Sequence, residues 1–356
     1  MALIFWLSLC FVLYVYIGYP AVLVMVRRVF GRPVKKQWCE PEVSIIIAAY
    51  NEREVIENKI RNCLALDYPK RKLQVIVSLD GPTDGSEFLV WKWVARGVEL
   101  VHTKEHRGKA SALNRAVKRA TGEIIIFADV RQTFAKSAVR ELVANFADPT
   151  VGAVSGELLL MSVSQNGEQN EDSSDVGLYW RYEKAIRSME SEIHSVPGAT
   201  GAIYAIRRDL YRDIPEDTLL DDVLIPLQIV LGGKRAVFDP EAKAYDMIAC
   251  CPLAEYGRKV RTLAGNYQLL VQAPQLLSPR QNPIFFQLVS HKLGRLLVPY
   301  ALMALIITNI FLLHGIYAVT FSLQAGWYIC AAAGRWLSHR EAIEPILLPE
   351  ESRRAA

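Results

Sequence analysis

The chain has 356 residues, 51% of them hydrophobic, and a formal net charge of +4 at pH 7. That length allows one large domain or two small ones, and the apolar content is high for a soluble protein. The modest positive charge gathers beside apolar segments, which favours anionic lipid headgroups and argues against nucleic acid as a partner. The six cysteines have neither disulfide-framework nor zinc-ligand spacing, which indicates reduced thiols.

An apolar segment opens the chain. No charged side chain occurs from Ala2 to Val26, a length that can cross a bilayer core of roughly 30 Å, and basic residues follow directly. Because basic residues favour the cytoplasmic side, we predict an uncleaved transmembrane anchor over residues 1–27 and a basic linker over residues 28–41. A buried hairpin of core helices is the alternative.

A second apolar region lies near the carboxyl terminus. No Asp, Glu, Lys or Arg occurs from residue 296 to residue 334. This predicts a transmembrane hairpin over residues 296–335, preceded by an amphipathic interfacial helix over residues 281–295 and followed by a cytoplasmic tail over residues 336–356. Three spans make this a multi-pass protein of the inner cell membrane, with its central domain in the cytoplasm.

Strands and helices alternate between the two apolar regions. This pattern predicts an α/β domain over residues 42–280, with a mostly parallel sheet and helices on both faces. A helix is expected between the first two strands, from about Arg53 to Leu66. The predicted strands are Val43–Ala49, Leu73–Leu79, Val98–His102 and the run that ends at Asp129.

Polar residues follow three of these strands. Ligands of open α/β sheets gather at the carboxyl ends of the strands, so Asp129 can meet a ligand there and hold a divalent cation through oxygen. Asp80 can accept a hydrogen bond from the imide N–H of a nucleobase, and Tyr50 can stack on the planar ring. The alternative is that Asp80 shapes its Asp-Gly turn and Tyr50 packs in the fold.

Two further sites open helices. Lys109 lies in an Arg-Gly-Lys loop, where backbone N–H groups and the helix dipole favour phosphate, although a solvated basic loop is the alternative. Asp221 and Asp222 begin a later helix, where one carboxylate can cap the helix and Asp222 can act as a base. Together these groups suit the displacement of a nucleoside diphosphate from a sugar.

Six motifs in this order closely resemble the landmarks of family 2 glycosyltransferases. The resemblance covers roughly Glu42 to Asn266, and the membrane-bound branch of cellulose, chitin and hyaluronan synthases is most similar. The motifs occupy residues 44–52, 78–85, 108–114, 127–129, 198–201 and 220–222.

The resemblance implies a GT-A fold and inverting transfer of a sugar from a nucleotide sugar, usually a UDP-sugar, to a polysaccharide or lipid-linked acceptor. It also implies Mg²⁺ or Mn²⁺ as the cofactor. The matched positions are Tyr50, Glu52 and Asp80 for the nucleoside, Lys109 for the donor, Asp129 for the metal, Gly198, Thr200, Gly201 and Asp221 for the acceptor, and Asp222 for the catalytic base.

Two motifs depart from the family pattern. The metal motif reads Asp-Val-Arg, so Arg131 stands where the second acid is expected. The Gln-x-x-Arg-Trp motif of processive synthases appears as Arg258-Lys-Val-Arg261-Thr262, which keeps acceptor-side arginines but loses Gln and Trp. We therefore expect a membrane-anchored transferase working beside polysaccharide export partners. A non-catalytic membrane subunit that binds a nucleotide sugar is the alternative.

Overall fold

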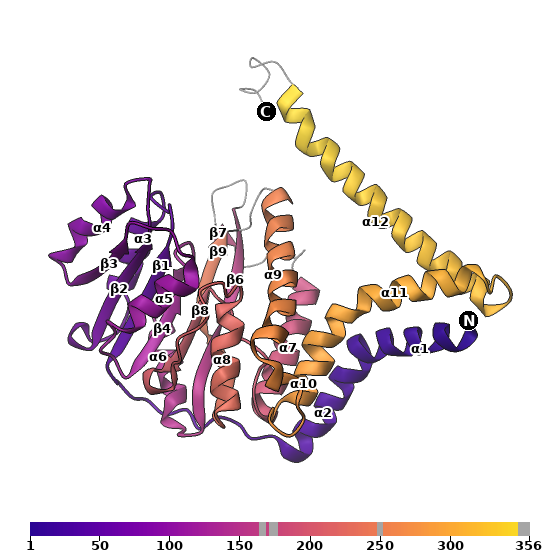
Figure 1. Ribbon diagram of the computed structural model, residues 1–356, viewed down its shortest axis with the longest axis horizontal. Coiled ribbons are helices and arrows are strands. Elements are labelled where there is room, and N and C mark those ends of the chain that lie inside the picture. Colours follow the sequence, from indigo (N-terminus) through magenta and orange to yellow (C-terminus); the bar gives the residue numbers. More distant parts are fainter. Residues whose placement is uncertain (164–168, 171–176, 248–251, 348–356) are drawn as a thin grey trace. The chain divides into compact units, whose positions relative to one another are not determined.

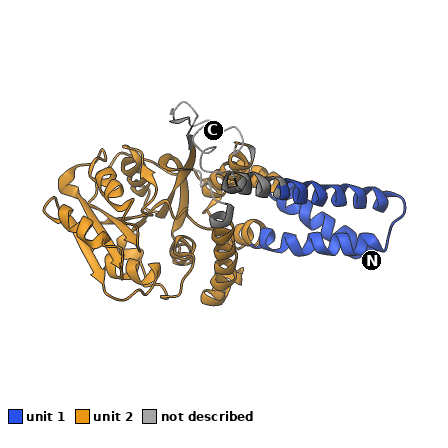
Figure 2. Cartoon of the chain, turned by 90° about the horizontal axis from the view of Figure 1, so that it is seen from above, with its two compact units in different colours: residues 1–19, 293–356 blue, residues 20–292 orange. Residues whose placement is uncertain are grey.

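The computed structural model describes residues 1–163, 169–170, 177–247 and 252–347. The chain forms two compact units, which Figure 2 colours separately. Unit 1 combines Met1–Tyr19 with Leu293–Ala356, and unit 2 is Pro20–Lys292. The terminal apolar regions therefore meet in one unit, and the α/β domain lies in the other.

Three apolar helical segments are long enough to cross a membrane: Ala2–Phe30, Phe285–Ile310 and Ile316–Gly334. Their length and composition are those of a membrane protein. Within unit 1 the amino-terminal helix α1 (Ala2–Leu13) packs beside the later helices, and Trp6 Nε1 donates a hydrogen bond to the hydroxyl of Tyr317 at 3.1 Å.

The helices of the predicted hairpin continue beyond the segment from residue 296 to residue 335. The short helix α10 (Phe285–Gln287) and the π-helix η6 (Leu288–Leu293) lead without a break into α11 (Gly294–Ile310), so the expected interfacial segment is continuous with the candidate span. The last helix, α12 (Ile316–Leu347), continues past Gly334 into the expected tail, and residues 348–356 lie outside the described residues. The interfacial and cytoplasmic placements stay predictions.

One sheet organises unit 2 (Figure 1), with strand order β3-β2-β1-β4-β8-β6-β9-β5. The run from β3 to β4 is entirely parallel, whereas β8 is antiparallel to both of its neighbours and β6 is again parallel to β9. The described strands are β1 (Val43–Ala49), β2 (Leu73–Asp80), β3 (Val98–Thr103), β4 (Ile124–Ala128), β5 (Thr133–Phe134), β6 (Val151–Val163), β7 (Gln169–Asn170, paired with β6), β8 (Ile203–Arg207) and β9 (Arg235–Met247).

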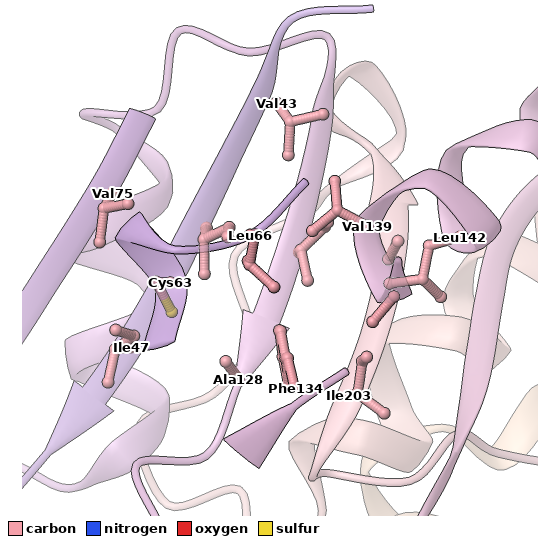
Figure 3. Packing of buried hydrophobic residues seen from close by; sticks show 14 of the residues in the cluster. Val43, Ile47, Cys63, Leu66, Val75, Ala128, Phe134, Val139, Leu142 and Ile203 are labelled. Carbon is pink, nitrogen blue, oxygen red and sulfur yellow. The ribbon is translucent and has the colours of Figure 1, made fainter. Parts of the chain in front are cut away.

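Helices cover both faces of this sheet because the central strands are apolar on both sides. In β1, Ile45 and Ile47 belong to one buried cluster and Ile46 to the other. Figure 3 shows part of the first cluster, in which Cys63 and Leu142 approach the strands. The helices that contribute to the first cluster are α3 (Ile56–Leu64), α4 (Ser86–Val94) and α6 (Ala138–Ala144). Those that contribute to the second cluster are α5 (Lys109–Val117), α8 (Asp221–Leu231) and α9 (Pro252–Gln272). The remaining helix of this region, α7 (Gly177–Ile193), borders β9.

The α/β fold with helices on both faces is confirmed, and the strand expected over Val43–Ala49 has those bounds. The helix expected from Arg53 begins later, at Ile56. The backbone N–H of Arg53 instead donates to the carboxylate of Asp84 at 2.8 Å, which ties this segment to the neighbouring loop. Arg53 thus lies in a turn that precedes the helix, where the backbone N–H of Ile56 donates to the carbonyl of Glu52 at 3.0 Å.

Candidate active site

The first predicted groups meet at one edge of the sheet. Strands β1, β2 and β4 run parallel, so the residues that follow them emerge on the same side. These residues are Tyr50 after β1, Asp80 at the end of β2 and Asp129 after β4. The parallel half of the sheet therefore brings an aromatic ring and two carboxylates to its carboxyl edge.

Asp80 is 2% exposed, and both of its carboxylate oxygens accept hydrogen bonds. Oδ2 accepts from the backbone N–H groups of Arg107 at 3.0 Å and Gly108 at 2.6 Å, while Oδ1 accepts from the Arg115 guanidinium at 2.8 Å. The ring of His106 lies 2.8 Å from Oδ2. Asp80 thus holds the loop before α5, and its expected contact with a nucleobase stays a prediction.

Tyr50 and Glu52 lie at the outer part of this edge. The Tyr50 ring is 43% exposed and stacks on His106, with ring centroids 3.9 Å apart. Glu52 accepts a hydrogen bond from the guanidinium of Arg131 at 3.0 Å. Arg131, which stands where the metal motif would have its second acid, is therefore paired with a predicted nucleoside-binding residue.

Lys109 connects the two halves of the site. Gly108, with φ +96°, turns the chain into α5, and the Lys109 ammonium lies 2.9 Å from Asp129 Oδ1 and 3.2 Å from Asp221 Oδ1. Burial works against the charged ammonium, but Asp129, Asp221 and Asp222 together raise the pKa of Lys109 well above its usual range. This cation is held charged among three carboxylates.

Two acids approach Gly201 on its side-chain face. A Cβ atom at this position would lie 3.2 Å from Asp222 Oδ2 and 3.3 Å from Asp129 Oδ2, so both carboxylates approach the bare backbone. Burial and the neighbouring Asp221 raise the pKa of Asp222 to about 6, although the charge of Lys109 opposes the shift. The residue expected to be the base therefore has a raised proton affinity.

A cavity of about 640 Å³ opens beside these acids. It combines carboxylates, a glycine turn and a basic residue, as a site that receives a polar acceptor requires. Thr200 is fixed there because its backbone N–H donates to the Ser155 hydroxyl at 3.1 Å. The predicted site residues that line the cavity are Asp129, Thr200, Gly201, Asp222 and Arg258.

Three predicted acceptor-side residues, Gly198, Asp221 and Arg261, do not line this cavity as the described residues define it. Asp221 instead pairs with Lys109 at 3.2 Å. Gly198 lies beneath the turn, where an added Cβ would meet Val223 at 3.2 Å and the Lys292 ammonium at 3.6 Å. Arg261 is exposed on α9. Their roles at the acceptor stay predictions.

The cavity wall also includes residues that the sequence analysis missed, among them Trp180 on α7, Asp246 on β9 and Lys259 on α9. Lys259 directly follows Arg258 in the motif-like segment, so its position was a usable signal. Trp180 and Asp246 have no motif around them. Only the packing of α7 and β9 beside the acids brings these two residues to the cavity.

Asp129 is the acid of this site that could bind a divalent cation. Among the described residues, no group of three or more His, Cys, Asp or Glu side chains is arranged to hold a metal. Asp129 directs one oxygen towards Lys109 and the other towards Gly201. Mg²⁺ is commonly bound by one or two carboxylates together with substrate phosphates. The residues therefore fit an ion held by one protein carboxylate and a diphosphate, and they do not form a closed protein cage.

Comparison with known proteins decides the class of this domain. A family model described as Glycosyl transferase family 2 matches residues 44–214. The chain carries a family 2 glycosyltransferase domain. The matched range includes Tyr50, Asp80, Lys109 and Asp129, while Asp222 lies just beyond it.

Related proteins extend this likeness over more of the chain. The glycosyltransferase domain is similar to the poly-beta-1,6-N-acetyl-D-glucosamine synthase of Staphylococcus aureus strain COL, with 25% identity over 240 residues, 65% of this chain and 56% of that protein. The Staphylococcus epidermidis synthase of the same name is 22% identical with the same coverage. The matched part thus spans little more than half the length of these relatives.

A solved structure shows a similar fold along nearly the whole chain. It is the mannosyltransferase PcManGT from Pyrobaculum calidifontis in complex with GDP-Man and Mn²⁺. The sequences are 26% identical, the TM-score is 0.66, and the match covers 94% of this chain and 99% of that chain. The expected GT-A fold is therefore confirmed, and so is the presence of a family 2 glycosyltransferase domain.

Proposed function

We propose that this protein is an inverting glycosyltransferase that moves a sugar from a nucleotide sugar to a glycan or lipid-linked acceptor at the cytoplasmic face of a membrane. The observation that carries the proposal is that the carboxylates of Asp129 and Asp222 both approach the side-chain face of Gly201, beside a cavity of about 640 Å³. A donor-side group and a base thereby face the same small space.

Asp222 is the proposed base. Its carboxylate takes the proton of the acceptor hydroxyl while that oxygen forms a bond to the anomeric carbon of the donor sugar. The bond from this carbon to the diphosphate oxygen breaks, and its electron pair leaves with the nucleoside diphosphate. Because attack and departure occur on opposite faces of the carbon, one displacement inverts its configuration.

Lys109 and the start of α5 are proposed to bind the diphosphate. Negative charge grows on the leaving group, and an ammonium fixed beside it lowers the energy of that charge. A Mg²⁺ or Mn²⁺ ion at Asp129 would supply further positive charge to the diphosphate. The Lys109 ammonium also neutralises Asp129 and Asp221 before the donor arrives.

Tyr50, Glu52 and Asp80 are proposed to form the nucleoside side. The exposed ring of Tyr50 suits base stacking, and Asp80 supports the loop that leads to Lys109. PcManGT was solved with GDP-Man, and the staphylococcal relatives are named for a polymer of N-acetylglucosamine. Our prediction of a UDP-sugar is therefore best tested beside GDP-mannose.

The acceptor is proposed to enter the cavity along the turn that contains Thr200 and Gly201. Arg258 and Lys259 add positive charge to the wall, which suits an acceptor carrying phosphate, as lipid-linked glycans do. Asp246 and Trp180 supply a hydrogen-bond acceptor and an aromatic surface on the same wall.

The experiment measures sugar transfer and nucleoside diphosphate release by the purified full chain with UDP-N-acetylglucosamine and GDP-mannose, with and without Mn²⁺. We expect Asp222→Asn to lower the transfer rate by about 10²–10⁴-fold, the usual contribution of a positioned base. Asp213→Asn is the matched control, since Asp213 forms an exposed pair with Lys118 at 2.9 Å. Equal rates for Asp222→Asn and the wild-type chain would remove Asp222 as the base.

The alternative, a non-catalytic subunit that binds nucleotide sugar, predicts another result. Its support is the pairing of Arg131 with Glu52 in place of a second metal acid. A subunit of this kind would bind a nucleotide sugar in calorimetry but release no nucleoside diphosphate with any donor, and Asp222→Asn would change neither measurement.

A further inference from the structure

A second cavity lies in unit 2, away from the acids. Its volume is about 280 Å³, and its walls come from α2 (Tyr19–Phe30), the end of α7 and α10. The helix α2 ends the first candidate membrane span, and α10 begins the second. The cavity therefore lies where two apolar helices join the glycosyltransferase domain.

One side of this cavity is apolar. Leu23, Val26 and Phe30 contribute from α2, and Phe286 contributes from α10. Phe30 and Phe286 remain 64% and 44% exposed, which is costly for aromatic rings in water but favourable for rings that contact lipid chains.

The other side is cationic. Arg32 and His194 line it, and Arg235 lies directly behind, where its guanidinium donates to the backbone carbonyls of Arg32 at 2.8 Å and His194 at 2.9 Å. Burial, Arg235 and Arg32 lower the pKa of His194, as a positive environment requires. The nearby Glu192 carboxylate is paired with Arg27 at 2.5 Å and so cancels little of this charge.

Arg32 is held in place through its backbone while its side chain stays available. Its N–H donates to the carbonyl of Glu192 at 2.6 Å, and its carbonyl accepts the bond from Arg235. Within the described part of the chain, the Arg32 guanidinium itself makes no hydrogen bond or ion pair. A fixed backbone with an open guanidinium is a suitable arrangement for binding a phosphate group.

We propose that this cavity binds one anionic phospholipid, with its phosphate on Arg32 and the first part of an acyl chain against Leu23, Val26, Phe30 and Phe286. The charge of the wall matches an anionic headgroup, and the apolar wall continues into two candidate membrane spans. The site depends on the placement of these helices in a membrane and is independent of the transfer reaction.

Native mass spectrometry of the full chain, released from detergent with added phosphatidylglycerol, phosphatidylcholine or inorganic phosphate, tests the proposal. We expect one bound phosphatidylglycerol per chain, less phosphatidylcholine, and no displacement by inorganic phosphate. Arg32→Gln should weaken retention about tenfold, because a charge-assisted hydrogen bond contributes about 1.5 kcal/mol or more. Phe286→Ala should weaken it as well.

Arg28→Gln is the matched control, because Arg28 is an exposed arginine of α2, four residues before Arg32, and does not line the cavity. It should retain phosphatidylglycerol as the wild-type chain does. Equal losses in Arg28→Gln and Arg32→Gln would indicate a diffuse basic surface and overturn the site. Equal retention of the two phospholipids, or displacement by inorganic phosphate, would also overturn it. A melting temperature unchanged by Arg32→Gln without lipid confirms that the variant is folded.

Discussion

The parallel and the mixed halves of the sheet supply the site in different ways. In the parallel half, from β3 to β4, strand ends deliver Tyr50, Asp80 and Asp129 directly to one edge. In the mixed half, Asp222 comes from the first turn of α8 and approaches Gly201 on the same side as Asp129. Donor-side geometry therefore depends on strand register, while the position of the base depends on the packing of a loop and a helix.

Asp80 and Asp222 show the consequence for two carboxylates. Asp80 is buried among backbone N–H donors, a guanidinium and an imidazole, so its charge is balanced by neighbours. Asp222 is half-buried, and loss of solvent together with the neighbouring acid Asp221 raises its pKa to about 6. A balanced carboxylate is suited to organise a loop, whereas a poorly balanced one is suited to accept a proton.

Besides the loss expected for Asp222→Asn, the largest effect is expected where the two halves meet, at Lys109. Lys109→Met removes the cation between Asp129 and Asp221 and leaves their carboxylates to repel each other. Removing a positive group beside a developing charge should lower the transfer rate on the order of 10²–10³-fold. Steady-state transfer kinetics measure this loss, and Lys118→Met, which breaks only an exposed pair with Asp213, should keep the wild-type rate.

A wild-type rate in Lys109→Met would show that the cation is needed for folding alone. Thermal unfolding of the same variant distinguishes a structural role of Lys109 from a role in transfer. Loss of a structural cation lowers the melting temperature whether or not the donor is present.

Asp80→Asn tests the parallel half. The substitution removes a buried charge that faces Arg115 and a loop of N–H donors, and breaking such a pair destabilises a protein by about 3–5 kcal/mol. Chemical denaturation followed by tryptophan fluorescence measures the change. Glu105→Gln is the matched control in the same loop, because Glu105 is 73% exposed and pairs with Arg107 at the surface. A loss of donor binding without a loss of stability would instead favour direct contact with the nucleobase.

The sequence predicted the parallel half well because its signals are local. Each strand is a short apolar run followed by the residue that forms the edge, so Val43–Ala49 and the position of Asp129 were both predicted. The family resemblance assigned Lys109 to the donor and Asp129 to the metal, and the structure brings these two side chains within 2.9 Å of each other.

The mixed half was harder to predict because its pairings are non-local. In β6, Gly152 and Gly156 interrupt the apolar run, yet a Cβ at Gly156 would clash with the carbonyl of Ala242 on β9. These glycines mark close strand contacts that a periodicity argument treats as breaks. The insertion of β8 between β4 and β6 likewise depends on pairings distant in sequence, and so Trp180 and Asp246 were missed.

The pH dependence of transfer tests the contrast between Asp80 and Asp222. A base with a pKa of about 6 must lose its proton to act, so kcat/KM should rise as the pH passes through about 6 and level off above it. In the unfolded chain an Asp has a pKa near 3.9. As the pH rises from about 4 to about 6, the unfolded state therefore loses this proton while the native state keeps it, and the free energy of unfolding decreases. Asp222→Asn should therefore melt higher than the wild-type chain at pH 8, with the difference shrinking towards pH 4.

Transfer rates and melting temperatures measured from pH 4.5 to pH 8.5 check both parts. Asp213→Asn should reproduce the wild-type curves. If kcat/KM of the wild-type chain rose near pH 4 instead of pH 6, the environment of Asp222 would not raise its pKa.

The smallest effect is expected at Arg131. Its exposed pair with Glu52 contributes less than about 1 kcal/mol, so neither Arg131→Ala nor Arg131→Asp should lower the melting temperature appreciably. Arg131→Asp adds an acid two residues after Asp129, and a second carboxylate oxygen should tighten Mn²⁺ binding in the presence of donor. Electron paramagnetic resonance of Mn²⁺ measures this affinity, with Arg131→Ala as the control that loses the pair but gains no oxygen. Equal affinities in the two variants would mean that the metal does not reach this loop and that Asp129 acts through Lys109.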